Sequence, residues 1–273
     1  MSGCRRGLRS AASAPGPRLL LLGWLLLPVG PAAGQEAPAY GDSTLGCSVF
    51  RESVRTDIRA QRGGPPYEER GQRTGLLVVR TTPATPLRFT AWYDSLVVWY
   101  DATEGRLVPD TDGLVGGRWE GTLSPTGNAT LTSRPFMPPE LRAISDLSDA
   151  LLDFFPPLPP VTIAPGRSWT DSLGLTISRL ADSLARPIPV QRYQWRIDSR
   201  SEPPLEADST ARLRQRATDE GVLAWMAGTG PLSWSRTVTI DTDVSGPGVR
   251  LPYRGKVTQR IEVIRITGHP ACY

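Results

Sequence analysis

Few residues of this 273-residue sequence could carry catalysis, and the first to consider is its single histidine, His269. A Ser-His-Asp triad or a zinc site would have to use this side chain, which lies close to the C-terminus. No G-x-S-x-G elbow, P-loop, H-E-x-x-H or dinucleotide motif occurs in the sequence. We therefore expect no enzyme activity, no catalytic residues, no metal site and no cofactor, and interpret His269 as exposed or hydrogen-bonded.

Two acidic stretches resemble fragments of calcium-binding loops. Asp110 to Gly113 and Asp241 to Asp243 each place two aspartates one residue apart. A complete twelve-residue loop also needs a central Gly and a terminal bidentate Glu, and neither stretch supplies both. We interpret the first stretch as a turn and the second as the solvent-exposed face of a strand. A hydrolase that uses two carboxylates needs no histidine and stays open as the least favoured alternative.

Two of the three cysteines lie near the ends of the expected mature chain. Cys4 falls in the N-terminal segment that we expect to be removed, which leaves Cys47 and Cys272. An even number of cysteines in an oxidising compartment favours a disulfide, so we predict a Cys47–Cys272 bond. Two separate buried thiols are the alternative.

Residues 1–34 have the pattern of an export signal. Arginines precede an apolar core at 19–29, and Ala32-Ala33-Gly34 provides small residues before a cut ahead of Gln35. The apolar core is short for a membrane span, which needs about 20 residues. We predict an exported protein, periplasmic or extracellular, with no stable membrane span after cleavage; retention of the segment as an anchor is the alternative.

The net charge of +4 comes from this same N-terminal segment, because it contains four arginines and no acidic residue. The remainder of the chain is formally neutral and has no run of basic residues. It therefore lacks the sequence signature of a nucleic-acid-binding protein and of a polybasic membrane-binding patch. We predict that nucleic acid is not a partner.

From Cys47 onward, apolar and polar residues alternate in many short stretches, which is typical of antiparallel sheet with one exposed face. The stretch 87–100 is long and aromatic, and Asp94-Ser95 predicts a bulge or a bend within it. Residues 113–133 predict a hairpin. We expect a flexible leader at 35–46, then one β domain at 47–273 with a large curved antiparallel sheet or an incomplete β-barrel. Two stacked sheets are the second choice.

The centre of the chain, residues 138–166, differs from the rest. Apolar residues recur at steps of three and four over 139–155, which predicts one main amphipathic helix packed on the sheet. Pro156 to Pro160 then prevents the helix from continuing and favours an extended path.

Seven tryptophans lie after the signal segment, mostly on predicted strands. Core packing is the simplest role for them. Alternatively, a curved sheet with a helix across it could enclose a cavity for an apolar ligand. The residues that we expect to line such a cavity come from the helix and the strands: Leu147, Leu151, Phe154, Trp119 and Trp195.

The proline-rich segment that begins at Phe154 and the following Pro165-Gly166-Arg167-Ser168-Trp169 resemble a junction in a group of exported bacterial β-rich proteins, a domain-of-unknown-function family. The overall plan is also similar to the periplasmic lipoprotein carriers, in which helices close an incomplete β-barrel over an apolar cavity. This resemblance implies binding of acyl chains without catalytic residues. Those carriers have their helices near the start of the chain, whereas this sequence predicts one in the middle.

Together these features predict an exported, non-catalytic protein of the bacterial envelope that binds a lipid or other apolar ligand between sheet and helix. The alternative is a structural or protein-interaction module without a small-molecule ligand. In that case a sheet edge or the segment 156–160 would contact an envelope protein partner.

Overall fold

The computed structural model describes residues 37–102, 105–183, 189–202, 212–246 and 249–273. The chain separates into two units, residues 1–35 and 36–273, and all described residues belong to the second. The predicted signal segment 1–34 therefore lies outside the described residues. Within the described part of the chain, no helix has the length and apolar character that a membrane span requires.

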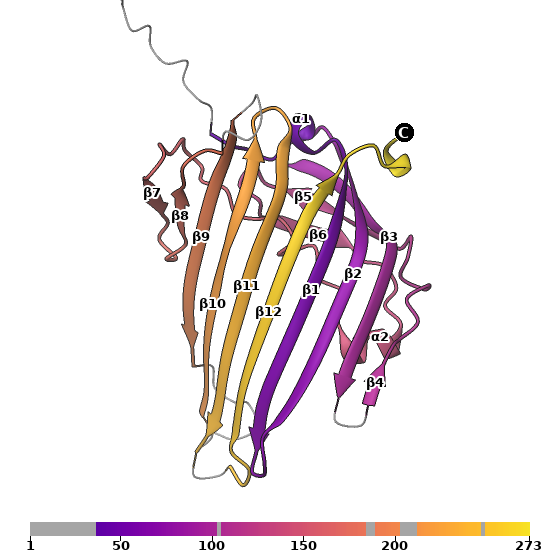
Figure 1. The fold of residues 1–273 in the computed structure, drawn as a ribbon, viewed down its shortest axis with the longest axis vertical. Coiled ribbons are helices and arrows are strands. Elements are labelled where there is room, and N and C mark those ends of the chain that lie inside the picture. The colour runs from indigo at the N-terminus through magenta and orange to yellow at the C-terminus, as the bar shows by residue number, and fades with distance from the viewer. Residues whose placement is uncertain (1–36, 103–104, 184–188, 203–211, 247–248) are drawn as a thin grey trace, which may run out of the picture. The chain divides into compact units, whose positions relative to one another are not determined.

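Twelve strands form one antiparallel sheet in the order β6-β5-β3-β2-β1-β12-β11-β10-β9-β8-β7, with β4 paired to β3 (Figure 1). Their bounds are β1 Cys47–Arg62, β2 Tyr67–Thr82, β3 Leu87–Ala102, β4 Gly105–Leu107, β5 Arg118–Leu123, β6 Ala129–Ser133, β7 Ser168–Thr170, β8 Thr176–Arg179, β9 Val190–Ser201, β10 Arg212–Met226, β11 Gly230–Ser245 and β12 Tyr253–Ile266. β6 and β7 end the sheet on opposite sides, so the sheet is not closed. The prediction of one large antiparallel sheet is confirmed.

The register of neighbouring strands sets which residues face inward. Phe50 of β1 lies opposite Leu77 of β2, and both are fully buried. Leu76 pairs with Ser95 and Leu77 with Tyr93, so Asp94 is an extra residue and the predicted bulge in this strand is present. A one-residue bulge reverses the alternation of faces along a strand. This reversal explains why even positions of β3 are buried after the bulge and odd positions before it.

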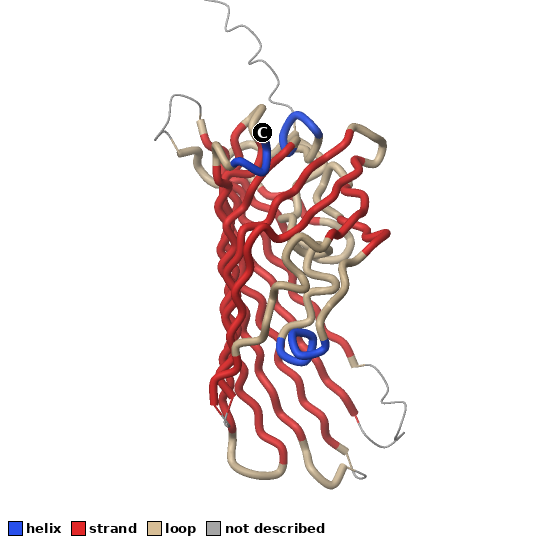
Figure 2. Tube along the Cα trace, turned by 90° about the vertical axis from the view of Figure 1, so that its right-hand side faces the viewer, coloured by secondary structure: helices blue, strands red, loops and turns tan. Residues whose placement is uncertain are grey.

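The segment 134–167, here called the strap, lies against one face of the sheet, called the inner face (Figure 2). Its helix α2 spans only Pro139–Ile144, so the predicted helix over 139–155 ends earlier than expected. Ser145 is extended, and the side chain of Asp146 accepts a hydrogen bond from the Ser148 N–H at 2.9 Å. Such local side-chain bonds compete with helical hydrogen bonding. The apolar residues of the predicted helical face are nevertheless buried: Leu141, Leu147, Leu151 and Phe154.

Both ends of the described unit are fixed in place. The region predicted as a flexible leader contains a short helix, α1 (Asp42–Leu45), and Tyr40 is only 3 % exposed. The Tyr40 hydroxyl donates to the Pro156 carbonyl at 2.9 Å, so this region packs on the strap. At the other end, a 3-10 turn, η1 (Pro270–Cys272), carries the cysteine that forms the predicted disulfide with Cys47.

Candidate ligand cavity between the strap and the sheet

A cavity of about 330 Å³ lies between the strap and the inner face of β1, β2, β11 and β12. Alternation along β11 directs Trp234, Val238 and Ile240 toward it, and Ile261 of β12 lies on the same face. The strap contributes Ala150 and Phe154. The apolar part of the lining therefore comes from both the sheet and the strap.

An aromatic cluster forms one end of this cavity. The Phe154 ring packs edge-on against Phe50 and Trp234, with centroids 5.6 and 5.0 Å apart. A second hollow of about 240 Å³ lies against the same Phe154 and Trp234 side chains, and Trp195 and Phe155 also line it. Since aromatic pairs of this geometry contribute about 0.5–1.5 kcal/mol beyond their buried area, this cluster holds the strap firmly to the sheet.

A buried polar group lies at the cavity wall. The Arg73 guanidinium donates two hydrogen bonds to the Glu52 carboxylate at 2.7 and 3.2 Å, and the Tyr93 hydroxyl donates to the same carboxylate at 2.6 Å. Burial raises the pKa of Tyr93, and the nearby Glu52 charge raises it further. Burial alone would lower the Arg73 pKa, but attraction to Glu52 outweighs it and the pKa is raised. The group is therefore an ion pair in which both carboxylate oxygens and two of the three guanidinium nitrogens are hydrogen-bonded within the protein.

A second arginine joins the strap to the sheet. Arg236 of β11 donates two hydrogen bonds to the Asp219 carboxylate of β10, at 2.9 and 2.7 Å. Its remaining terminal nitrogen donates to the Asp153 carbonyl in the strap. Arg236 lines both hollows and fixes the part of the strap that separates them.

The strap side of the cavity is acidic, because it carries Asp146, Asp149 and Asp153. Asp149 pairs at 2.7 Å with Arg134, which does not line the cavity. With Glu52 included, four acidic side chains and two arginines line the cavity. The lining therefore has an excess of two negative charges. The lining thus combines apolar walls with an acidic border.

Beyond the cavity, the inner face continues without cover from the strap, and the strands extend past α2 (Figure 2). Ile58, Val257, Ile240 and Ala217 lie opposite one another on four neighbouring strands. All four are half-buried. An apolar surface therefore leads away from the cavity along the sheet.

The residues expected to line a cavity are all buried, but only two of them reach one. Phe154 lines both hollows and Trp195 lines the smaller one. Leu147, Leu151 and Trp119 pack in the core and line none of the cavities described here, and the Trp119 indole N–H donates to the Ser148 carbonyl at 3.0 Å.

The sequence reasoning missed the polar lining, Glu52, Arg73 and Arg236. The sequence does carry a signal for Glu52. Residues 50, 52 and 54 share one face of the alternating strand, and a charged residue between the apolar Phe50 and Val54 indicates a buried polar group.

The other residues considered for chemistry have structural contacts. His269 Nδ1 accepts a hydrogen bond from the Ala271 N–H at the start of η1. Cys272 is disulfide-bonded, so it has no thiolate for a metal ion. The Asp110 carboxylate accepts from the Asp112 N–H at 2.9 Å, which is the turn geometry expected there. Among the residues that the structure describes, no three His, Cys, Asp or Glu side chains form a metal-binding group.

Comparison with known proteins gives structural matches of low sequence similarity. No family model matches the chain, and no curated protein matches it. A solved structure described as lipid-protein interactions in lipovitellin aligns with 80 % of this chain at a TM-score of 0.43 and 11 % sequence identity. The alignment covers 25 % of that chain, so this chain spans about a quarter of its length.

Proposed function

We propose that this protein is an exported, non-catalytic binding protein that holds an apolar chain in the cavity between the strap and the inner face of the sheet. The observation that carries the proposal is the 330 Å³ cavity and its continuity with the half-buried apolar residues Ile58, Val257 and Ile240. Small-molecule sites are typically cavities of about 300–1,000 Å³. This cavity lies near the lower end of that range, and about half of its lining residues are apolar.

The charge of the lining indicates which ligands fit. Arg73 and Arg236 are each paired with a carboxylate inside the protein, so neither supplies an unpaired positive charge to a ligand. The excess of acidic groups repels a carboxylate or phosphate head group. A neutral apolar molecule or a cationic amphiphile is therefore preferred over a fatty acid.

Two features support the export and the absence of catalysis in this proposal. The Cys47–Cys272 disulfide is of the kind that persists in oxidising compartments. Hydrogen bonds from Ser148 lower the pKa of Asp146, which lines the cavity, whereas a general acid in a carboxylate hydrolase needs a raised pKa.

The test uses N-phenyl-1-naphthylamine, a neutral apolar dye that becomes fluorescent in an apolar site. We expect saturable binding to the purified protein, with energy transfer from Trp234, which lines the cavity. The anionic cis-parinaric acid should bind more weakly. Native mass spectrometry of protein taken from its own envelope, before and after denaturation, would identify the class of a bound natural ligand.

A matched pair of variants locates the site. Ala150→Leu adds volume inside the cavity, so it should weaken dye binding about tenfold. Ala143→Leu makes the same change at an exposed position of α2 and should leave binding unchanged. Absence of saturable binding in the wild type, or equal binding by both variants, would overturn the proposal.

A further inference from the structure

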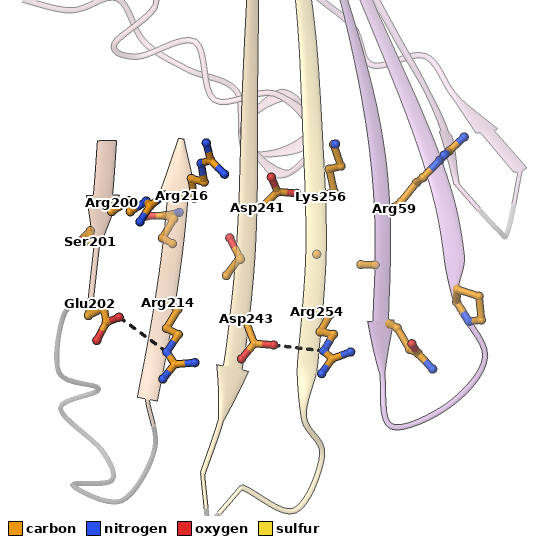
Figure 3. Close-up of a pocket in the computed structure, with 16 residues that line it drawn as sticks. Arg59, Arg200, Ser201, Glu202, Arg214, Arg216, Asp241, Asp243, Arg254 and Lys256 are labelled. Atoms are coloured by element: carbon orange, nitrogen blue, oxygen red, sulfur yellow. Dashed lines mark hydrogen bonds and ion pairs between the residues drawn. The ribbon is translucent and has the colours of Figure 1, made fainter. Parts of the chain in front are cut away.

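A larger cavity, of about 580 Å³, lies at the end of β1, β9 and β11 and at the start of β10 and β12 (Figure 3). Two rows of side chains border it on the outer face of the sheet, the face opposite to the strap. The first row contains Arg59, Lys256, Asp241, Arg216 and Arg200, and neighbours within it are paired in register. The second row contains Gln61, Arg254, Asp243, Arg214 and Glu202. We call the space between them the outer groove.

The two rows differ in charge. In the second row, Arg254 pairs with Asp243 at 3.2 Å and Arg214 with Glu202 at 3.7 Å, so that row is neutral (Figure 3). The first row has four cations and one acid. One wall of the outer groove is therefore neutral and the other is cationic.

The cations of the first row are poorly neutralised by the rest of the protein. Arg59 pairs with Glu68 at 3.1 Å, but Lys256 and Arg200 form no ion pair with any residue that the structure describes. Arg216 interacts electrostatically with the Asp198 carboxylate, but that carboxylate is already paired with Arg196 at 2.9 Å. Elsewhere on the outer face, Arg260 pairs with Asp57 at 2.8 Å, and Arg55 and Arg70 approach the same carboxylate at 3.6 and 3.7 Å. Within the outer groove, the first row therefore keeps a net positive charge.

The order of charges along the first row sets a spacing. Arg59 and Lys256 lie on the adjacent strands β1 and β12, and Arg216 and Arg200 lie on the adjacent strands β10 and β9. Asp241 lies on β11, between these two pairs. Strands are about 4.8 Å apart, so the centres of the two cation pairs are separated by about 14 Å. An extended peptide rises about 3.4 Å per residue, so residues i and i+4 are separated by the same distance and point to the same side.

We propose that the outer groove binds an extended segment of a partner protein with acidic residues at positions i and i+4. Their carboxylates contact the Arg59/Lys256 and Arg200/Arg216 pairs, and the residue at i+2 faces Asp241. Arginine suits this role because its guanidinium binds carboxylates through two parallel hydrogen bonds. Because Asp241 is negative, the residue at i+2 is neutral or basic.

Two other anionic partners fit less well. A nucleic acid or another continuous polyanion would place negative charge opposite Asp241, which repels it. An anionic membrane surface favours a broad basic face, whereas the cationic row is one residue deep and the row beside it is neutral. Charge complementarity therefore selects a ligand with two separated negative groups.

The probe is a fluorescein-labelled, end-capped peptide with the core Glu-Ser-Lys-Ser-Glu, and binding is measured by anisotropy at low salt. The control peptide, Glu-Ser-Glu-Ser-Lys, has the same composition and net charge but places its acids two residues apart. We expect at least about threefold tighter binding of the first peptide. Added salt should weaken binding, because the contacts are solvent-exposed ion pairs.

Variants then assign the contacts. Arg200→Ala combined with Arg216→Ala should weaken binding about tenfold. Arg51→Ala, on the outer face of β1 but far along the strand from Arg59, should leave binding unchanged. Asp241→Lys places a positive charge opposite residue i+2 of the peptide. This variant should therefore prefer an acid at i+2 and bind Glu-Ser-Glu-Ser-Glu better than Glu-Ser-Lys-Ser-Glu.

Two results would overturn the proposal. The first is that neither peptide binds at low salt, and the second is that both bind equally. If neither peptide binds, binding of vesicles of 70:30 phosphatidylcholine and phosphatidylglycerol that is lost in the Arg200/Arg216 double variant would assign the outer groove to a lipid surface. None of these results affects the cavity under the strap, because the two sites lie on opposite faces of the sheet.

Discussion

Glu52 and Arg73 form a hydrogen-bonded ion pair at the wall of the strap cavity, with side chains only 3 % and 12 % exposed. The two residues lie on adjacent strands, and Glu52 is opposite Gly75 rather than a larger side chain. This arrangement leaves room for the guanidinium and for the Tyr93 hydroxyl, which donates to the same carboxylate. The cavity wall is therefore polar at one place, without an unpaired charge.

Removal of Glu52 should be costly. Glu52→Leu leaves Arg73 buried without its partner, and breaking a buried pair in this way costs about 3–5 kcal/mol. The double change Glu52→Leu/Arg73→Met should recover most of this loss. The free energy of unfolding is measured in urea, with Glu68→Leu as the control. The Glu68–Arg59 pair is exposed, so its loss should cost below about 1 kcal/mol. Similar losses for Glu52→Leu and Glu68→Leu would contradict the prediction.

The disulfide should contribute strongly to stability. Cys47 and Cys272 are 225 residues apart in sequence, so the bond closes a long loop in the unfolded chain. On the chain-entropy estimate, a loop of this size stabilises by about 5 kcal/mol. Cys47→Ser/Cys272→Ser should lower the denaturant midpoint accordingly. A reducing agent should do the same to the wild type and should not affect the variant. An unchanged midpoint in both experiments would rule out this contribution.

Stability should fall in alkaline solution because of two buried tyrosines. Burial raises the pKa of Tyr40 and of Tyr93 well above 10.0 in the folded protein. Above pH 10 the unfolded chain loses these protons while the folded protein keeps them, so the stabilisation is present below pH 10 and is lost as pH rises. Each tyrosine contributes a slope of up to about 1.4 kcal/mol per pH unit.

Urea unfolding at pH 9, 10 and 11 measures this effect. Tyr93→Phe and Tyr40→Phe should each reduce the slope. Tyr273→Phe, at a side chain that is 92 % exposed, is the control and should keep the wild-type slope. A wild-type slope in all three variants would show that the buried tyrosines are not its source.

Gly221 should tolerate no side chain. It lies opposite Trp195 in the β9–β10 pair, and a Cβ atom on it would overlap the Trp195 ring and the Ser235 carbonyl. Gly221→Ala should therefore destabilise the protein by about 1–3 kcal/mol and change the Trp195 environment. Gly64→Ala is the control, since its nearest neighbour would be the Arg62 carbonyl at 3.9 Å. Thermal unfolding and near-ultraviolet circular dichroism compare the two, and equal behaviour would show that the Trp195 contact can relax.

Much of the sheet could be predicted from alternation, because a strand's two faces meet different environments. The hairpin of β5 and β6 is an example, since Trp119, Gly121 and Leu123 all face inward as the pattern indicates. The length of α2 could not be predicted in this way. The apolar spacing over 139–155 is helical, but Asp146 forms a local turn with Ser148, and the strap buries the same residues without helical structure.

The sequence by itself determined the fold class, the bulge at Asp94 and the pairing of Cys47 with Cys272, because each depends on local pattern or on a count. Only the tertiary structure decided which residues line the cavity under the strap and which line the outer groove. The chain after residue 34 is formally neutral and has no basic run, yet β1 pairs with β12 and thereby places Arg59 beside Lys256. Charges from the beginning and end of the chain meet in the outer groove because strand order in the sheet differs from order in the sequence.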